Sequence, residues 1–498
     1  METFDLLLWG LASALQPNHL FFALVGCLIG TLVGVLPGVG PVAGTAILVP
    51  VTFSMDPTSA IIMLSGIYYG AMYGGTITSV LVNVPGEAAS AITCLDGYSM
   101  AKAGRAGPAL AVAAFGSFVG GTIATLALVM LAMPLTRVAL SFGPPEFFAL
   151  MMIGLALVAV LAGKSMILGL MSAVFGLLIS LVGIDPVMGG TRFTFGNTAL
   201  LGGISIVPVA MGLFGVSEIL DGMWSSRKAP STERVTGLMP SREDVRRSAP
   251  AVMRGSIIGT IMGLIPGMNA FIPTVMSYVA ERRVSKTPEQ FGKGMIEGVA
   301  GPETANNAYA NAALIPLFTL GVPGSPTIAV LMGAFLMNGL TPGPLLFVEH
   351  ADVAWTIIAS LFVGNLILVI LNVPMIPLWV SLLRIPRLML NSAILALCIL
   401  GVYTVNNSAF DILLMAFFGL LGVAMKRLGM PAAPMILTVV LGPLLEQSLR
   451  QSLEISQGSA AIFFTRPVTA VLLGLACFIF LSSVFRIVRK VRGTDAEV

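Results

Sequence analysis

Two Pro-Gly dipeptides in apolar surroundings, Pro85-Gly86 and Pro323-Gly324, are the positions where this sequence could best bind an anion. Proline interrupts a helix, and glycine lets a ligand approach the backbone closely. Free N–H groups at the positive end of the next helix dipole can then hold negative charge. Neither motif contains Lys or Arg. We therefore expect main-chain amides, rather than fixed positive charges, to bind the anion.

Hydroxyl and amide side chains near these dipeptides could add directed hydrogen bonds. A second pair of turns, the LPG motif around Pro37 and the IPG motif around Pro266, could supply further backbone amides. The candidate substrate-binding residues are Pro37, Gly38, Gly40, Thr76, Ser79, Asn83, Pro85, Gly86, Gly267, Asn269, Asn307, Asn311, Pro323, Gly324 and Ser325. The candidates for a coupling ion, Na⁺ or H⁺, are Glu303, Thr78 and Thr327.

A polar stripe runs along one predicted helix, because Glu303, Asn307 and Asn311 recur every four residues. The residues 238 positions earlier are Ser65, Tyr69 and Tyr73. In lipid, such a stripe must face other helices or a watery cavity. Three explanations stay open: hydrogen bonds that hold helices together, contact with a substrate, and binding of a cation or gating.

Two acidic residues near the motifs have different expected roles. Glu87 follows Pro85-Gly86 and could complement a helix dipole, bind a cation or take up a proton. Beside a carboxylate ligand it would repel that ligand. Glu303 begins a predicted helix and is the better candidate for coupling. A coupled Na⁺ could also use carbonyl groups of unwound turns, which leave no side-chain pattern in the sequence.

The composition identifies the elements that must carry these residues. Of 498 residues, 56% are hydrophobic and only 10% are charged, and the net charge is +3. A soluble domain has about 25% charged residues, so we exclude a soluble enzyme, a nucleic-acid binder and a disordered scaffold. The continuous apolar runs predict an all-α polytopic membrane protein with about 11–12 transmembrane segments. Four scattered cysteines and two distant histidines predict no metal site, and we expect no cofactor.

The second half of the chain repeats the first. GTLVGVLPGVG (30–40) matches GTIMGLIPGMN (259–269) at a shift of 229 residues, and LVNVPGEAAS (81–90) matches TLGVPGSPTI (319–328) at a shift of 238. SMILGLMSAVFGLLISLVGIDP (165–186) also resembles SAFDILLMAFFGLLGVAMKRLGMP (408–431). Three matches in the same order indicate an internal repeat, which is typical of secondary transporters.

Loop charges predict that the two repeats are inverted. The loop at 282–293 carries four basic residues, whereas its counterpart carries Asp56 and no base. The loop with Lys102 and Arg105 has a counterpart with Asn338 and no base. Since basic residues mark cytoplasmic loops, equivalent loops lie on opposite sides. Segments 20–50 and 255–280, of about 30 and 26 residues, are too short for two crossings each, so they predict re-entrant helix–turn–helix hairpins.

These patterns divide the chain into four parts. We predict a first transmembrane repeat at 1–223, a cytoplasmic linker at 224–254, a second, inverted repeat at 255–450, and a C-terminal part at 451–498 with an extra transmembrane helix and a cytoplasmic tail. The linker is assigned because ten charged residues fall between Ser225 and Arg254.

At these motifs the chain resembles the large membrane subunit of the tripartite tricarboxylate transporters. The matching stretches are GVLPGVGP (34–41), YYGAMYGGTITSVLVNVPGEAAS (68–90), LDGYSMAKAGRAGPAL (95–110), GLIPGMNAFIP (263–273) and TLGVPGSPTIAVLMGAF (319–335). The resemblance implies a permease of the bacterial inner membrane with a small four-helix membrane subunit and a periplasmic solute-binding protein as partners. It implies cation-driven uptake of carboxylates such as citrate. Asn269 stands where Gly40 stands in the first half, so the two hairpins are not equivalent.

The resulting hypothesis is a Na⁺- or H⁺-coupled carboxylate transporter that is not an enzyme. An intramembrane enzyme and a passive anion channel are the alternatives, although no HExxH or GxSxG motif occurs. We expect the hairpins and Pro-Gly helices of both halves to move as one unit, elevator-fashion, past a scaffold of long helices at 108–220 and 344–448. A homodimer formed through that scaffold is an expectation by analogy, and no nucleic-acid partner is expected.

Overall fold

The computed structural model describes residues 3–36, 39–161, 165–185, 188–224, 237, 239–382 and 387–494. The chain is 80% helical, which confirms the all-α class. Seven helices in the described ranges are long and apolar enough to cross a membrane. They are α2 (Pro17–Val35), α4 (Pro57–Val82), α6 (Ala106–Leu140), α17 (Ala351–Asn372), α19 (Arg387–Asn406), α20 (Ala409–Arg427) and α21 (Ala432–Ile455). The protein is therefore a multi-pass membrane protein, and the figure of 11–12 crossings stays a prediction.

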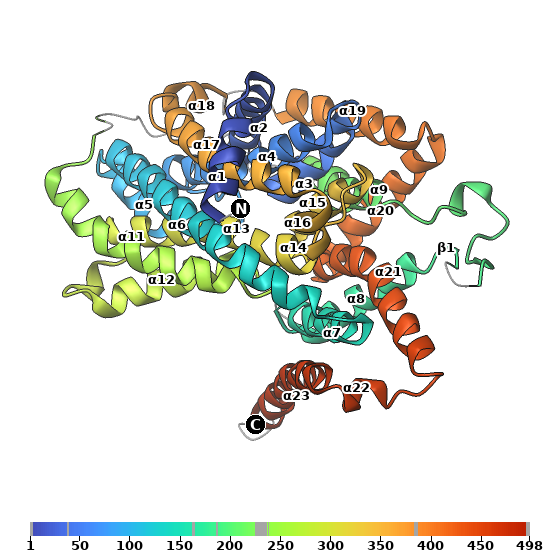
Figure 1. Cartoon of the computed structure of the whole chain (residues 1–498). Coiled ribbons are helices and arrows are strands. Elements are labelled where there is room, and N and C mark those ends of the chain that lie inside the picture. Colours follow the sequence, from blue (N-terminus) through green and yellow to red (C-terminus); the bar gives the residue numbers. More distant parts are fainter. Residues whose placement is uncertain are drawn as a thin grey trace.

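The remaining helices and strands connect these seven helices (Figure 1). In the first half they are α1 (Thr3–Ala14), α3 (Gly40–Leu48), α5 (Thr93–Lys102), α7 (Pro144–Leu161), α8 (Met166–Ser180), the strands β1 (Gly183–Ile184) and β2 (Thr191–Arg192), α9 (Ile206–Ala210) and α10 (Ser217–Trp224). In the second half they are α11 (Arg242–Gly263), α12 (Phe271–Val284), α13 (Glu297–Ala312), α14 (Leu314–Leu320), α15 (Pro326–Met337), α16 (Pro344–Glu349), α18 (Ile376–Leu382), α22 (Ile462–Thr465) and α23 (Pro467–Thr494). A π-helical turn at Met211–Val216 joins α9 to α10.

One closely packed pair of helices occurs twice. Glycines on α2 face the backbone of α4, and a Cβ atom at Gly30 would lie 2.6 Å from the Ile67 carbonyl oxygen. Glycines on α11 face α13 in the same way, and a Cβ at Gly259 would collide with the Ala305 carbonyl oxygen. Small residues let helix backbones approach closely in membranes. The contacting glycines are Gly26, Gly30 and Gly34 on α2, and Gly255, Gly259 and Gly263 on α11.

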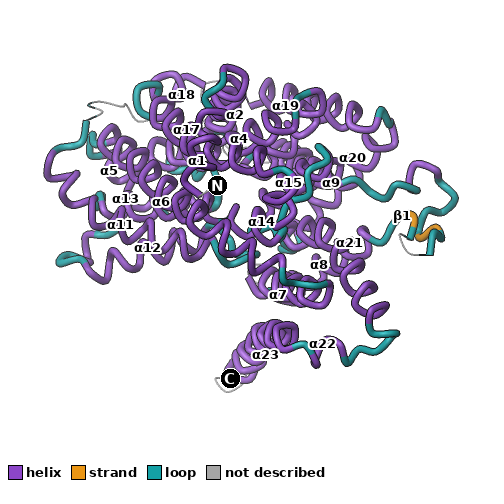
Figure 2. Tube along the Cα trace, in the orientation of Figure 1, coloured by secondary structure: helices purple, strands orange, loops and turns teal. Residues whose placement is uncertain are grey.

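Each half also covers the helix pair of the other half. Helix α6 packs along α11 and α13, while α17 packs along α2 and α4 (Figure 1). Likewise α8 packs on α21, and α20 packs on the π-helical turn. The β1–β2 hairpin projects from one end of the molecule, and α23 lies apart from the main body, against α7 (Figure 2). Helices α6 and α17 thus lie against the glycine-rich pairs of both halves, and their expected role as scaffold helices stays a prediction.

The two hairpin segments each form a long helix, a turn and a shorter helix. Helix α2 has 19 residues and α3 has nine, while α11 has 22 and α12 has 14. Gly40 and Gly267 take left-handed conformations at the turns, with φ of 67° and 77°, which glycine adopts without strain. Pro37 and Gly38 lie outside the described residues. Since α2 alone is long enough to cross a membrane, re-entry stays a prediction.

The polar stretch between the halves is shorter than its charges suggest. Residues 242–254, assigned above to the linker, form the beginning of α11. Ser241 starts this helix: its Oγ accepts from the N–H of Asp244 (3.1 Å), and the Asp244 carboxylate accepts from the N–H of Ser241 (3.0 Å). This reciprocal capping, followed by good helix formers, outweighs the high charge density.

Candidate functional site

A cavity of about 750 Å³ brings the turns of both halves together. The LPG and Pro-Gly regions of the first half line it through Gly40, Pro41, Pro85 and Gly86. The second half contributes Gly267, Met268, Asn269, Ser325, Pro326 and Thr327. Four turns that are far apart in sequence therefore form one concave site, in the manner of a small-molecule binding pocket.

Backbone contacts hold the turns in place. The N–H of Gly267 donates to the carbonyl of Gly324 (3.0 Å), which joins the second hairpin directly to the second Pro-Gly turn. The Tyr309 hydroxyl donates to the Met268 carbonyl. In the first half, Gly86 lies against the backbone of Gly34 and Gly75, so that a side chain there would collide with both. These contacts explain why glycine is required at Gly86.

Helix α15 begins at the cavity wall. Ser325 caps it, because its Oγ accepts from the N–H of Ile328 (3.3 Å), and Pro326 occupies the first helical position. No equally long helix follows the first Pro-Gly turn, where a short 3₁₀ turn at Ala89–Ala91 leads into α5. The two halves therefore present different backbone geometry to the cavity, in addition to the exchange of glycine for Asn269.

Two buried carboxyl groups lie at or beside the cavity. Glu87 lines it and accepts a hydrogen bond from Asn306 Nδ2 (2.6 Å). Glu303 does not line it; its carboxylate accepts from the hydroxyls of Thr76 (2.5 Å) and Thr93. Within the described ranges, neither carboxyl group forms an ion pair with Lys, Arg or His. Both are thus held by neutral donors only.

Seven of the predicted ligand residues line the cavity: Gly40, Pro85, Gly86, Gly267, Asn269, Ser325 and Thr327. The remaining candidates that the structure describes are not among the lining residues, and Pro37 and Gly38 lie outside the described residues. Ser79 and Thr78 donate to the Gly75 carbonyl of their own helix, and Asn83 is an exposed residue that ends α4 in a left-handed conformation, with φ of 54°. Pro323 and Gly324 are buried in the turn before α15.

The polar stripe of α13 faces neighbouring helices. Asn307 Nδ2 donates to Ser117 Oγ of α6 (2.7 Å), and Asn311 donates to the Asn307 carbonyl (3.2 Å). On α4, the Tyr73 hydroxyl donates to Asn365 of α17 (2.7 Å). The bonds of Asn307 and Tyr73 join different helices, so of the three explanations left open above they favour hydrogen bonds that hold helices together.

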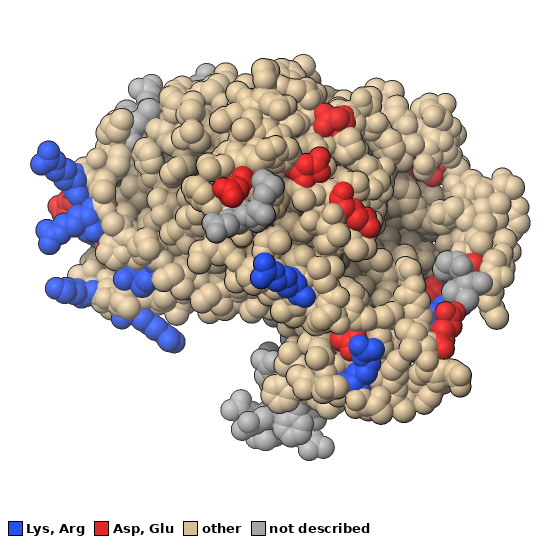
Figure 3. Space-filling model, in the orientation of Figure 1, with Lys and Arg blue, Asp and Glu red and all other residues tan. Residues whose placement is uncertain are grey.

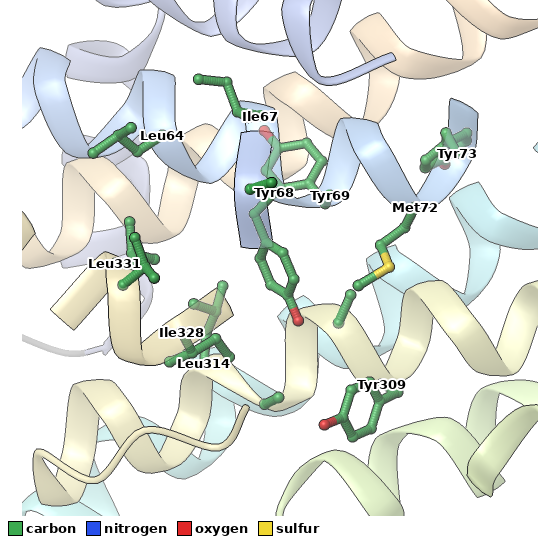
Figure 4. Packing of buried hydrophobic residues seen from close by; sticks show 14 of the residues in the cluster. Leu64, Ile67, Tyr68, Tyr69, Met72, Tyr73, Tyr309, Leu314, Ile328 and Leu331 are labelled. Atoms are coloured by element: carbon green, nitrogen blue, oxygen red, sulfur yellow. The ribbon is translucent and has the colours of Figure 1, made fainter. Parts of the chain in front are cut away.

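Several cavity residues were not among the sequence candidates. Tyr68 and Met72 of α4 and Tyr309 of α13 form part of the wall. Figure 4 shows Tyr68 reaching from α4 towards the helix that carries Tyr309. The Tyr68 hydroxyl is buried and lies beside Ser325, another residue of the cavity wall. The YYGAMYGG run could have suggested these aromatic residues, because hydroxyls in an apolar motif need partners.

Lys426 of α20 also lines the cavity. Its Nζ lies 2.9 Å from a Glu218 carboxylate oxygen and 2.5 Å from one of Asp221, both on α10. Lys426 is not among the candidate residues of the sequence analysis. Its position near the site depends on how α20 packs on α10, which the sequence does not reveal.

Comparison with known proteins shows the family of this chain. The profile of the tripartite tricarboxylate transporter TctA family matches residues 20–437. This chain belongs to that family. It is 48% identical over 482 residues to an uncharacterized 52.8 kDa protein in the TAR-I ttuC' 3' region of Agrobacterium vitis, covering 96% of each chain. It is also 48% identical over 217 residues to an uncharacterized protein in the TAR-II ttuC' 3' region of the same organism, covering 44% of this chain and 90% of that one.

No solved structure matches this chain. The family is one of membrane transporters that work with other subunits. The resemblance described above is confirmed. The chain is therefore a component of a membrane transporter. The names of the two relatives state no activity.

Proposed function

We propose that this chain is the large permease subunit of a binding-protein-dependent secondary transporter that imports a di- or tricarboxylate such as citrate. The observation that carries the proposal is the convergence of four Gly- or Pro-rich turns from both halves on one cavity. Interrupted helices at the interface of two repeats are the usual binding sites of secondary transporters. A volume of about 750 Å³ is ample for a citrate-sized ligand.

The cavity offers a carboxylate neutral hydrogen-bonding groups and, within the described lining, no unpaired positive charge. The described lining residues include the hydroxyls of Tyr68, Ser325 and Thr327 and the amide of Asn269. Lys426 is the one basic lining residue within the described ranges, and its charge is offset by Glu218 and Asp221. Such a site binds an anion through hydrogen bonds and can release it again, which a transporter requires.

Contacts between the halves support the inverted arrangement. Asp96 of α5 accepts from the N–H groups of Gly292 (2.9 Å), Gly294 (2.8 Å) and Met295 (2.7 Å), in the loop after α12. Non-equivalent loops of the two halves thus lie together, and both are basic. Figure 3 shows Lys and Arg gathered at the end of the molecule formed by α5, α11 and α12. Exposed bases at this end include Lys102, Arg242, Arg246, Arg282, Arg283 and Lys286. By the positive-inside rule this end is cytoplasmic.

The remaining assignments are part of the same proposal. The membrane is the bacterial inner membrane, the partners are a small four-helix membrane subunit and a periplasmic solute-binding protein, and the coupling ion is Na⁺ or H⁺ with Glu303, Thr78 and Thr327 as candidate ligands. The two hairpins and Pro-Gly helices move as one elevator unit. Because α6 and α17 pack so closely on α2, α4, α11 and α13, we assign both to the moving unit rather than to the scaffold.

Reconstitution tests this function. The chain is incorporated into liposomes with its partner subunits, the binding protein is added outside, and accumulation of radiolabelled citrate, malate and succinate is followed under an imposed Na⁺ or H⁺ gradient. We expect at least one of these carboxylates to accumulate, and collapse of the gradient by an ionophore to abolish accumulation. Uptake that equilibrates but never exceeds the outside concentration would indicate a passive channel instead.

A further inference from the structure

We propose that Glu87 couples transport to protons: its side chain must take up a proton before a carboxylate can occupy the cavity, and it releases that proton after the carboxylate has left. This inference rests on the proposed function and assigns its coupling ion. The sequence pattern pointed to Glu303 for this role. The structure favours Glu87, because Glu87 lines the cavity and Glu303 does not.

The charges around the cavity make an ionised Glu87 incompatible with an anion. The titratable groups that face Glu87 from neighbouring elements are Tyr68 of α4, Tyr309 of α13 and Glu303 of α13. Across the cavity lie Glu218 and Lys426, which pair with each other. None of these groups supplies an unpaired positive charge. A carboxylate ligand would therefore meet the like charge of Glu87 in a poorly solvated site, which is strongly unfavourable.

Asn306 suits both protonation states of Glu87. Its Nδ2 now donates to Glu87 Oε1 (2.6 Å), as a carboxylate requires. Its Oδ1 is buried and has no partner among the described residues, so no other hydrogen bond fixes the orientation of the amide. After a flip, Oδ1 could accept the O–H of a protonated Glu87. A Lys or Arg at this position would instead keep Glu87 ionised.

Glu303 has a different environment. Hydroxyls of Thr76 and Thr93 donate to its two carboxylate oxygens, and Ser117 Oγ donates to its main-chain carbonyl (3.2 Å). These contacts join α4, α5 and α6 to α13 around a carboxyl group that is 1% exposed. This arrangement positions helices, and it gives no direct path to the ligand.

Protons and charge balance in this coupling step. On the outward side, one proton binds a Glu87 carboxylate oxygen, the charge of the side chain becomes zero, and the ligand enters. After the site has opened inward, the ligand leaves and the proton dissociates from Glu87 into the cytoplasm. The repulsion between an ionised Glu87 and a carboxylate ligand thus prevents the carboxylate from being carried without a proton.

Calorimetry on the purified full chain tests this inference. Citrate, malate and succinate are titrated at several pH values in buffers with different ionisation enthalpies, which gives the number of protons taken up on binding. Because the ionisation of each ligand is the same for every variant, the difference between variants reports the protein. We expect wild type to take up about one proton more than Glu87→Gln, and its affinity to fall about tenfold per pH unit where Glu87 is ionised. The affinity of Glu87→Gln should lack this additional pH dependence.

The variants separate the alternatives. Glu289→Gln changes an exposed acid outside the cavity and should behave as wild type, and Glu303→Gln should retain the extra proton uptake. Equal proton uptake by wild type and Glu87→Gln would overturn the inference, as would ligand binding by wild type that is linked to Na⁺ and not to protons. If Glu87→Gln does not fold, the absence of any proton uptake by wild type beyond that of the ligand overturns it equally. Failure of all three carboxylates to bind would instead remove the proposed function.

Discussion

Thr327 and Thr319 show how one residue type serves two purposes in this chain. Both are buried near the second Pro-Gly turn. Thr319 donates to the Ile315 carbonyl of its own helix (2.7 Å), whereas Thr327 lines the cavity. Asn307 and Asn269 differ in the same way, because one bonds Ser117 and the other faces the cavity. The type of side chain did not distinguish these roles.

Removing one cavity hydroxyl should weaken carboxylate binding. We expect Thr327→Val to raise the Kd for the transported carboxylate about tenfold or more, because a hydrogen bond to a charged group contributes about 1.5–3 kcal/mol. Binding is measured by calorimetry. Thr319→Val is the matched control, and it should leave the Kd within about twofold of wild type. A larger effect at Thr319 would argue that the binding site lies elsewhere.

The amide of Asn307 should contribute to the stability of the folded protein and not to carboxylate binding. We expect a double-mutant cycle of Asn307→Ala and Ser117→Ala to give a coupling energy of about 0.6 kcal/mol, and at most about 1.7 kcal/mol, as for other hydrogen bonds between membrane helices. Unfolding in mixed micelles measures this energy. Carboxylate affinity should stay unchanged in Asn307→Ala; a loss of affinity at full folding would show that Asn307 contacts the ligand.

At the scale of elements, the two glycine-rich helix pairs are the clearest repeated feature. We expect Gly30→Ala and Gly259→Ala to destabilise the protein by similar amounts, about 1–3 kcal/mol each, because each new Cβ meets a carbonyl of the partner helix. Gly474→Ala on α23 is the control, since nothing lies within 4 Å of its Cβ. There alanine should be neutral or stabilising, by up to about 1 kcal/mol. Unfolding in mixed micelles measures all three, and a neutral Gly259→Ala would contradict the equivalence of the pairs.

The stability that the capping residues of α11 contribute should depend on pH. Burial alone would raise the pKa of Asp244, but hydrogen bonds from Arg105 and Ser241 outweigh burial and lower it below its usual range. Stability from this group is therefore complete above the unfolded pKa of about 3.9 and is lost as pH falls through the lower folded pKa. We expect Asp244→Ala to lose about 1 kcal/mol near pH 7 and much less at pH 2. Stability is followed by thermal unfolding, and a pH-independent difference would contradict this account.

At the scale of the whole molecule, the inverted arrangement predicts which loops share a side of the membrane. After replacement of the four native cysteines, single cysteines are placed at exposed positions. We expect Lys102→Cys and Glu289→Cys to react with an impermeant thiol reagent from the cytoplasmic side, and Ser54→Cys and Thr341→Cys from the opposite side. If the repeats were parallel, the cysteines at Lys102 and Thr341 would react from one side of the membrane, and those at Ser54 and Glu289 from the other.

The sequence by itself determined the class of protein and the elements of the site. Apolar composition requires a membrane, because so few charged residues cannot cover a water-facing surface. The spacing of glycines and prolines repeats along the chain, and it marked the turns that line the cavity. The sequence does not show that α11 begins directly after Ser241, within the predicted linker, because charge density does not reveal a helix cap.

Only the tertiary structure decided which polar residues face the cavity. Helical spacing places Glu303, Asn307 and Asn311 on one face of α13, but it does not say which neighbour covers that face. Contacts between distant parts of the chain settle this: Asn306 meets Glu87, 219 residues away, and Lys426 meets Glu218 across 208 residues. Such pairs form because each half packs its long helices on the other half. Local sequence patterns do not predict this packing.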